Sequence, residues 1–284
     1  MPLEVVRTIE DGRRWSERAR LAGRRLALIP TMGYLHQGHL TLIAEGRARA
    51  DVAVVSIFVN PMQFGPREDL ARYPRDLQGD LEKSERAGAE MVFAPSVEEM
   101  YPEGFQTFVE VTQVSRGLCG DVRPGHFRGV ATVVSKLFNV VRPHLAVFGE
   151  KDYQQLQVIR ALNRDLGFGI EIVGVPTVRE PDGLAMSSRN AYLSPDERAR
   201  ALSLSRGLGA ARDLARQGVS DVDALKGAVW RELEGAAVRA DYVEVVDATS
   251  LVPLSRYDPA RPARALVAGY VGQTRLIDNL ALDG

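Results

Sequence analysis

The 284-residue sequence is short of cysteine and of net charge, and each shortage excludes a class of protein. Cys119 is the only cysteine, which excludes an internal disulfide and a multi-cysteine metal site and suits a reducing compartment. We expect Cys119 to be a buried or half-buried thiol. The formal net charge is -1, so no overall basic field gathers nucleic acid or an anionic membrane. An anionic ligand must therefore be held by local groups.

Long apolar runs are also missing. No segment approaches the roughly 20 apolar residues of a membrane helix, and the amino terminus lacks the apolar core of a signal peptide. We therefore expect a cytoplasmic protein with no membrane partner. The chain has instead 45% hydrophobic and 26% charged residues, which suffices for a full core in one large domain or two modest ones.

Short apolar runs alternate with helical spacing in the first 175 residues. Five runs are typical of buried strands because they are apolar nearly throughout: residues 25–29, 52–59, 90–94, 145–148 and 170–175. Between the first two, Leu40, Ile43, Ala44 and Ala48 recur at helical spacing. This order predicts the α/β class, with a doubly wound (Rossmann-like) parallel sheet covered by helices on both faces.

The composition and the order of predicted elements change after about residue 176. A segment rich in turn residues leads to two predicted helices, near 194–217 and 221–239, and then to two predicted strands at 241–248 and 264–271. We interpret residues 176–284 as a smaller C-terminal α+β domain, joined to a first domain of residues 1–175.

The first strand-to-helix loop contains the residues best suited to bind a ligand. Residues 30–39 read Pro-Thr-Met-Gly-Tyr-Leu-His-Gln-Gly-His, and such loops are where doubly wound sheets bind ligands. Gly33 and Gly38 allow the backbone to approach a phosphate, and the following helix offers free N–H groups at its amino terminus. His36 and His39 lie three residues apart, so both imidazoles can point at one anion. On spacing alone, two histidines in a loop are more often unrelated surface residues.

The loop resembles a known family. His-Gln-Gly-His resembles the HxGH signature of the nucleotidylyltransferase superfamily, and the longer string PTMGYLHQGHL is similar to the pantoate–β-alanine ligase family. Other segments resemble the same family in the same order: residues 56–80, 119–139, 148–160 and 186–194, with GQTRLIDN at 272–279 fitting its carboxyl-terminal strand. The resemblance covers nearly the whole chain.

The resemblance implies a two-step condensation that uses ATP. The carboxylate of (R)-pantoate attacks the α-phosphorus of ATP, which gives pantoyl adenylate and pyrophosphate. The amine of β-alanine then attacks the acyl carbon and releases pantothenate and AMP. The family also implies a homodimer, and a C-terminal domain that closes over the first as a lid. Mg²⁺ is expected with ATP, bound chiefly through phosphates and water.

The resemblance also implies which residues act on ATP. We expect His39, the assigned general acid, to work with His36, Lys151 and Arg189 on the charge of the phosphates. The full set of expected ATP contacts is Met32, Gly33, Tyr34, Leu35, His36, Gln37, Gly38, His39, Gly149, Glu150, Lys151, Asp152, Val178, Met186, Ser187, Ser188 and Arg189. Met-Ser-Ser-Arg at 186–189 is similar to the mobile KMSKS-type loop of other adenylate-forming enzymes.

Pantoate and β-alanine need polar contacts of their own. The family implies Gln63 and Gln155 for pantoate, because neutral amides can hold its oxygens without a full salt bridge. Further candidates for these two substrates are Asn60, Tyr73, Arg123 and His126. The metal ligands stay unknown, since nothing selects among Asp69, Asp76 and Asp80. His144, which follows a proline and precedes a strand, is interpreted as structural.

Two other functions stay open at this level. One is a different nucleotidylyltransferase, in which a phosphate ester attacks ATP or CTP and the nucleotide stays in the product; release of AMP only when an amine is added would distinguish the ligase. The other is a non-catalytic nucleotide-binding or RNA-interacting module on the same fold. The lack of a basic face argues against the module.

Overall fold

The computed structural model describes residues 3–66 and 68–283 of the chain, which separates into two compact units. The first comprises residues 1–116, 123–150 and 158–176, and the second comprises 117–122, 151–157 and 177–284. This division differs from the predicted one because two short segments, 117–122 and 151–157, group with the C-terminal part. No helix in the described part of the chain is both long enough and apolar enough to cross a membrane.

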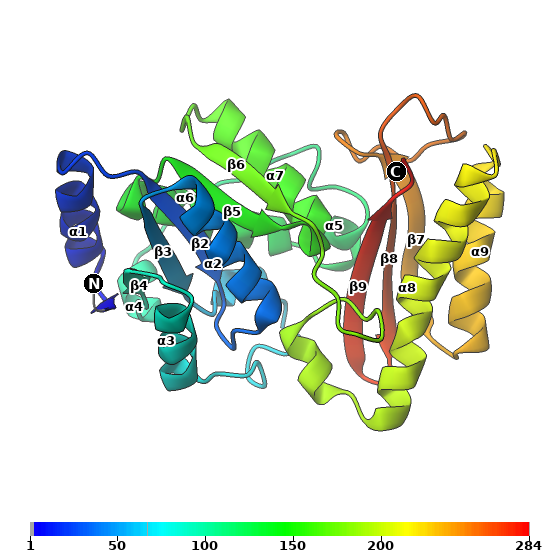
Figure 1. Ribbon diagram of the computed structural model, residues 1–284, viewed down its shortest axis with the longest axis horizontal. Coiled ribbons are helices and arrows are strands. Elements are labelled where there is room, and N and C mark those ends of the chain that lie inside the picture. The colour runs from blue at the N-terminus through cyan, green and yellow to red at the C-terminus, as the bar shows by residue number, and fades with distance from the viewer. Residues whose placement is uncertain (1–2, 67, 284) are drawn as a thin grey trace. The chain divides into compact units, whose positions relative to one another are not determined.

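The first unit contains a parallel sheet. Among the residues described, its six strands run in the order β1-β4-β3-β2-β5-β6 (Figure 1). Their bounds are β1 Glu4–Val6, β2 Leu26–Thr31, β3 Val52–Ile57, β4 Met91–Phe93, β5 Leu145–Gly149 and β6 Glu171–Val175. All their pairings are parallel. The predicted doubly wound sheet is therefore confirmed, and β1 is a strand that the sequence analysis missed.

Helices cover both faces of this sheet. Leu42 and Ile43 of α2 (Gln37–Arg49) pack with Ile29 and Val55 on one face, and α3 (Leu77–Arg86) contributes Leu81 to the same cluster. On the other face, α1 and α6 lie against each other. The other helices of this part are α1 Ile9–Leu21, η1 Pro61–Gln63, α4 Val97–Met100 and α6 His126–Val141, while α7 Tyr153–Asp165 starts in the second unit and continues in the first.

The strand order brings three loops to one edge of the sheet. β3, β2 and β5 are neighbours and parallel, so the segments that follow them leave from the same edge. These segments are 58–64, 32–36 and the turn that begins at Glu150. The chain order reverses between β2 and β5, and such a switch point is where open α/β sheets bind ligands.

The second unit is an α+β structure. Its described strands form an antiparallel sheet in the order β7-β8-β9, with β7 Arg239–Asp247, β8 Ala263–Val271 and β9 Thr274–Ala281. Its other elements are α5 Cys119–Val122, η2 Glu150–Asp152, η3 Ser188–Tyr192, α8 Pro195–Arg216 and α9 Val222–Gly235, of which η2 begins in the first unit. Figure 1 shows α8 and α9 side by side next to this sheet, where Leu208 and Val229 pack with Val245 and Val267.

Candidate active site

The backbone N–H groups of the first loop are largely occupied by the chain itself. The hydrogen bonds are Gly33 N to Thr31 Oγ1 at 3.2 Å, Tyr34 N to Asp80 Oδ2 at 2.7 Å, Leu35 N to Asp80 Oδ1 at 2.6 Å, His36 N to His39 Nδ1 at 3.3 Å, Gly38 N to His36 Nδ1 at 3.1 Å and His39 N to His36 O at 2.8 Å. These N–H groups therefore shape the loop, and the approach of a phosphate to Gly33 and Gly38 stays a prediction.

Asp80 is the residue that fixes the loop, and the sequence analysis had considered it only for Mg²⁺. It is 1% exposed, and both its carboxylate oxygens accept N–H groups from the loop. Gly33 has a φ of 84°, and a Cβ there would lie 2.9 Å from Asp80 Oδ2. Glycine is needed at this position because the carboxylate packs against it. Burial raises the pKa of Asp80, against the two N–H bonds that favour the carboxylate.

His36 and His39 cap the start of α2 reciprocally. His36 Nδ1 accepts from Gly38, and His39 Nδ1 accepts from His36. Because each Nδ1 is an acceptor, the proton of each neutral ring is on Nε2. The ring centroids are 4.1 Å apart. The caps therefore orient two Nε2–H donors from one helix terminus.

Asn60 and Gln63 follow β3 and form a buried amide pair. Asn60 Nδ2 donates to Gln63 Oε1 at 3.1 Å and to the Gly129 carbonyl at 3.1 Å, and Gln63 Nε2 lies 3.3 Å from Met32 Sδ. Gln63 is 9% exposed. The structure thus brings together Gln63, predicted for pantoate, and Asn60, a candidate for pantoate or β-alanine, and places Gln63 beside Met32 of the first loop. Tyr101, which the sequence analysis missed, donates to Asn60 Oδ1 at 2.8 Å.

Arg123 and His126 are engaged in a polar cluster of the first unit. Arg123 Nε and Nη2 donate to Glu68 at 2.8 and 2.6 Å. His126 Nδ1 donates to the Gln63 carbonyl at 2.8 Å, so its Nε2 accepts from Arg123 at 3.1 Å. Burial would raise the pKa of Glu68, but the hydrogen bonds and charge of Arg123 outweigh it and hold the pKa low. Glu68 therefore compensates the charge of Arg123.

Tyr73 is buried at 6% exposure, with its ring 5.9 Å from that of Phe64 in an edge-to-face contact. Leu35 is 3% exposed, so its side chain belongs to the core. Gln37 is exposed on the first turn of α2. Of the expected residues after β5, Gly149 and Glu150 are half-buried and belong to the first unit.

Lys151, Asp152 and Gln155 belong to the second unit. The Lys151 side chain is 19% exposed and its Nζ lies 4.0 Å from Asp152 Oδ2. The Lys151 carbonyl accepts from Asn279 Nδ2 of β9 at 2.9 Å, and Arg264 Nη1 donates to Asn279 Oδ1 at 2.6 Å. β9 therefore fixes the backbone of Lys151.

The same strand fixes the segment that carries residues 186–189. Arg179 forms two hydrogen bonds to Asp278, at 2.7 and 3.0 Å, and Asp278 is 3% exposed. Arg179 pairs with Ala185 in an antiparallel bridge, and Met186 N donates to the Val178 carbonyl at 2.9 Å. Adjacent residues of β9, Asp278 and Asn279, thus hold this segment and Lys151. Both lie in the 272–279 string, but the sequence analysis gave neither a role.

Within the 186–189 segment, backbone and hydroxyl groups are ordered locally. Ser187 Oγ accepts from Arg189 N at 3.3 Å and caps η3, and Ser188 is 6% exposed. Asn190 donates to Glu180 Oε1 at 2.7 Å and to the Ala185 carbonyl at 3.1 Å. The segment is therefore a folded turn of the second unit.

Asp80 and Asp76, which were both considered for Mg²⁺, bind backbone N–H groups of their own chain. Asp80 binds the first loop, and Asp76 Oδ1 accepts from Gly79 N at the start of α3. Nowhere in residues 3–66 or 68–283 do three or more His, Cys, Asp or Glu side chains gather to hold a metal ion. His144 is structural, as expected: its Nδ1 accepts from Leu26 N at 3.0 Å. Cys119 is buried.

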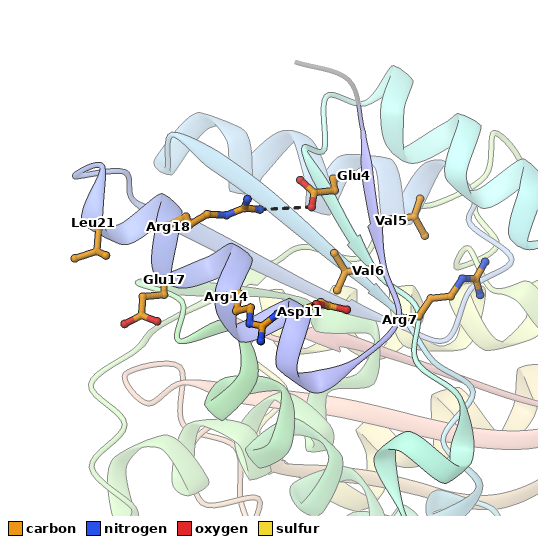
Figure 2. Close-up of a pocket in the computed structure, with 9 residues that line it drawn as sticks. All are labelled: Glu4, Val5, Val6, Arg7, Asp11, Arg14, Glu17, Arg18 and Leu21. Carbon is orange, nitrogen blue, oxygen red and sulfur yellow. Dashed lines mark ion pairs between the residues drawn. The ribbon is translucent and has the colours of Figure 1, made fainter.

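A pocket beside β1 and α1 contains none of the predicted site residues (Figure 2). Its lining is Glu4, Val5, Val6, Arg7, Asp11, Arg14, Glu17, Arg18 and Leu21. Several of its charges compensate one another, since Arg18 lies 3.5 Å from Glu4 and Arg14 lies 3.9 Å from Asp11. We assign it no ligand.

A Rossmann-like sheet with two capping histidines at its switch point defines the class, an α/β protein of the HxGH type. The family described as Pantoate-beta-alanine ligase matches residues 4–281. The pantothenate synthetase of Myxococcus xanthus is 65% identical over 281 residues, which cover 99% of this chain and 96% of the relative.

Solved structures agree. A pantothenate synthetase from Thermus thermophilus superposes with a TM-score of 0.94 at 49% identity, covering 99% of this chain and 100% of that chain. A pantoate-beta-alanine ligase from Francisella tularensis, complexed with beta-gamma ATP and beta-alanine, gives 0.81 at 30% identity, covering 99% and 98%. The chain belongs to the pantoate-beta-alanine ligase family and is an enzyme of pantothenate synthesis.

Proposed function

We propose that this chain joins (R)-pantoate to β-alanine in two steps, through a pantoyl adenylate, with release of pyrophosphate and AMP. The observation that carries the proposal is the family match over residues 4–281, at whose HxGH positions His36 and His39 form the reciprocal cap. In-line attack at phosphorus asks the protein mainly to position the reactants and to place positive charge and donors where negative charge develops.

In the first step, the Nε2–H groups of His36 and His39 would donate to phosphate oxygens of ATP. The caps support this role because they fix each ring with Nδ1 turned to the backbone. A cationic His39, able to act as a general acid, would need a proton on Nδ1 and so would lose its bond from His36 N–H. We therefore propose neutral donors that stabilise the leaving pyrophosphate as the main contribution of this pair.

The pantoate carboxylate needs neutral donors, because a salt bridge would weaken it as a nucleophile. Gln63 suits this role: its amide is buried, it is held by Asn60, and it lies beside Met32. Gln155 is the second expected contact and is half-buried on α7. We propose that Arg123 and His126 support Gln63 through its carbonyl, in place of the direct substrate contact first expected.

Lys151 and Arg189 would supply cationic charge to the phosphates, with Asp152 accepting from the ribose. The ties from Asn279 to Lys151 and from Asp278 to Arg179 support this, since they fix both segments on one strand. Residues 149–152, 178 and 186–189 stay the proposed ATP contacts of this part. The role of residues 176–284 as a lid also stays a prediction.

Three further proposals follow from the family. Mg²⁺ accompanies ATP and is held by phosphate oxygens and water, as suits an ion that dehydrates reluctantly. The chain works as a homodimer, which is the commonest symmetric assembly of soluble proteins. It acts in the cytoplasm, which its single cysteine supports.

Isotope exchange between pyrophosphate and ATP tests the reaction. We expect exchange when pantoate is present and β-alanine is absent, because the adenylate forms reversibly. AMP should accumulate stoichiometrically with pantothenate only after β-alanine is added. Exchange that ignores pantoate, or a nucleotide retained in the product, would contradict the adenylate.

A further inference from the structure

Asn60, which directly precedes η1, uses its whole side-chain amide inside the first unit and is 1% exposed. Its Oδ1 accepts from Tyr101 Oη at 2.8 Å and from Met62 N at 3.2 Å. Its Nδ2 donates to the Gly129 carbonyl and to Gln63 Oε1, both at 3.1 Å. A primary amide has two acceptor sites and two hydrogens, so these four bonds leave no capacity for a substrate.

The backbone sets the orientation of the Asn60 amide. A main-chain N–H can only donate, and a main-chain carbonyl can only accept. Met62 N therefore fixes the place of Oδ1, and the Gly129 carbonyl fixes the place of Nδ2. Turning the amide by half a turn would set an oxygen against the carbonyl and an N–H₂ against the N–H. Asn60 thus has one orientation, in which Nδ2 meets Gln63.

Gly129 of α6 makes this contact possible. A Cβ at residue 129 would lie 2.2 Å from the Met62 carbonyl oxygen and 2.7 Å from Gln63 N. Any larger residue would therefore push α6 away from η1. The close approach brings the Gly129 carbonyl within hydrogen-bond distance of Asn60.

The orientation of Asn60 determines that of Gln63. Because Asn60 Nδ2 donates, the atom of Gln63 that faces it must be the acceptor, Oε1. Gln63 Nε2 is then the other end of the amide, and it lies 3.3 Å from Met32 Sδ of the first loop. A thioether is a weak acceptor. The Gln63 N–H₂ group can therefore exchange this contact for a stronger one to a substrate oxygen.

Tyr101, which follows α4, holds Asn60 from the other side. Its ring centroid lies 6.1 Å from that of Phe58 and 5.1 Å from that of Phe105. Burial raises the pKa of Tyr101, so its hydroxyl stays protonated at neutral pH. The Tyr101 hydroxyl is therefore a packed donor to Asn60 Oδ1.

We propose that Asn60 is a positioning residue, which holds Gln63 Oε1 so that Gln63 presents only its N–H₂ group to the substrate. This role takes the place of the direct substrate contact expected from the sequence, and it rests on the pantoate role of Gln63 in the proposed function. The atom that Gln63 binds must then be an acceptor, such as a carboxylate or hydroxyl oxygen. A glutamine free to turn would bind donors and acceptors alike.

A double-mutant cycle separates positioning from direct contact. In pyrophosphate exchange without β-alanine, Asn60→Ala should raise KM for pantoate about tenfold, because Gln63 loses the bond that orients it. KM for ATP should change less than about threefold. In a Gln63→Ala background, Asn60→Ala should also change KM for pantoate less than about threefold, since no amide is left to position.

Tyr101→Phe repeats the test with the packing of the ring kept. It removes one of the two donors to Asn60 Oδ1, so we expect KM for pantoate to rise about threefold. This rise should also vanish in the Gln63→Ala background. Tyr270→Phe removes a hydroxyl from β8 in the second unit. It is the matched control and should leave KM for pantoate unchanged.

Asn60→Asp tests the polarity itself. Asp keeps the acceptor for Tyr101 and Met62 but has no N–H₂ group. Gln63 would turn to donate to it, and Oε1 would then face the substrate. KM for pantoate should rise at least about threefold beyond its value in Asn60→Ala. This excess should disappear in the Gln63→Ala background, whereas an excess that persists would be charge repulsion and would overturn the polarity.

The remaining outcomes separate this role from the proposed function. A native chain without pantoate-dependent exchange overturns both. Exchange in the native chain, with effects of the Asn60 and Gln63 substitutions that multiply, would make Asn60 an independent contact and overturn its positioning role alone. An equal rise of KM for ATP and for pantoate, with a lower melting temperature, would make Asn60 a general structural residue and also overturn that role.

Discussion

Asp80 determines the shape of the first loop although it lies 45 residues beyond Leu35. Its carboxylate binds two consecutive N–H groups, and Gly33 leaves room for it. The sequence analysis located the loop from the strand before it and the helix after it. It could not assign Asp80, because a carboxylate so far along the chain gives no local signal of which backbone it will bind.

We predict that Asp80→Asn impairs the use of ATP. Asn keeps the size of the side chain but has only one oxygen, so its amide N–H₂ would face one of the loop N–H groups. We expect kcat/KM for ATP to fall roughly ten- to a hundredfold, as for a misplaced reacting group. Steady-state kinetics with ATP varied checks this. Unchanged kinetics would show that the loop holds its shape without Asp80.

Burial raises the pKa of Asp80, so keeping this carboxyl ionised in the folded chain at neutral pH costs free energy of folding. Asp80→Asn should therefore retain most of the unfolding free energy at pH 7, measured in urea. A large loss of stability together with the loss of activity would make Asp80 a general structural residue instead of a positioning residue for the loop.

The two roles considered for His39 can be separated by substitution. His39→Ala should lower kcat by about two to four orders of magnitude, because a donor to the pyrophosphate is lost. His39→Gln keeps an N–H donor but has no titratable proton, and we expect at least about tenfold more activity than in the alanine variant. Single-turnover measurement of adenylate formation isolates this step. Equal inactivity of both variants would favour proton transfer by His39.

At the scale of elements, the sequence predicted strands and helices well where one period dominated. The strands at 52–59 and 145–148 are apolar nearly throughout and appear as β3 and β5, and the helix at 194–217 appears as α8. β1 was missed because it has only three residues. The segment 105–112 has strand-like residues but lies outside both sheets, because pairing depends on partners distant in sequence.

His144 connects the starts of two strands and gives the fold a pH dependence. Its Nδ1 accepts from Leu26 N, and burial, with the charges of Arg20 and Arg25, lowers its pKa below the ordinary value of 6.5. The folded state then binds fewer protons than the unfolded state, so stability is present above pH 6.5 and is lost as the pH falls.

We predict that the unfolding free energy declines between pH 6.5 and 5 by less than the one-proton limit of about 1.4 kcal/mol per pH unit, since His144 is only half-buried. His144→Asn keeps an acceptor for Leu26 N and removes the titration, so it should flatten this decline. Urea titrations of both proteins at several pH values provide the comparison. Parallel declines would assign the effect to other groups.

At the scale of the whole molecule, the chain passes between its two units at 116–117, 122–123, 150–151, 157–158 and 176–177. The sequence predicted one passage, near residue 176, because the change in composition there is visible. The other four passages bound two short segments, 117–122 and 151–157, of six and seven residues. Segments of that length have no composition of their own, so only three-dimensional contacts assign them to a unit.

We predict that residues 177–284 do not fold alone as they fold in the full chain. The fragment would lack Tyr153, which stacks on Arg264 at 3.8 Å and donates to the Ala248 carbonyl at 2.8 Å. It would also lack Cys119, whose Sγ lies 3.2 Å from the Tyr242 hydroxyl. We expect circular dichroism to show a lower melting temperature than in the full chain, or no cooperative transition. A fragment that melts like the full chain would support an independent domain starting at 176.

The occupied N–H groups of the first loop have a consequence for inhibitor chemistry. A compound that mimics a phosphate bound by main-chain amides, as in a glycine-rich cradle, would find those amides at residues 33–36 already used. Selectivity over enzymes with such cradles should come from acceptors spaced to meet two imidazole Nε2–H groups whose rings are 4.1 Å apart. An inhibitor aimed at this loop should therefore be designed to bind the two imidazole side chains and not the backbone amides.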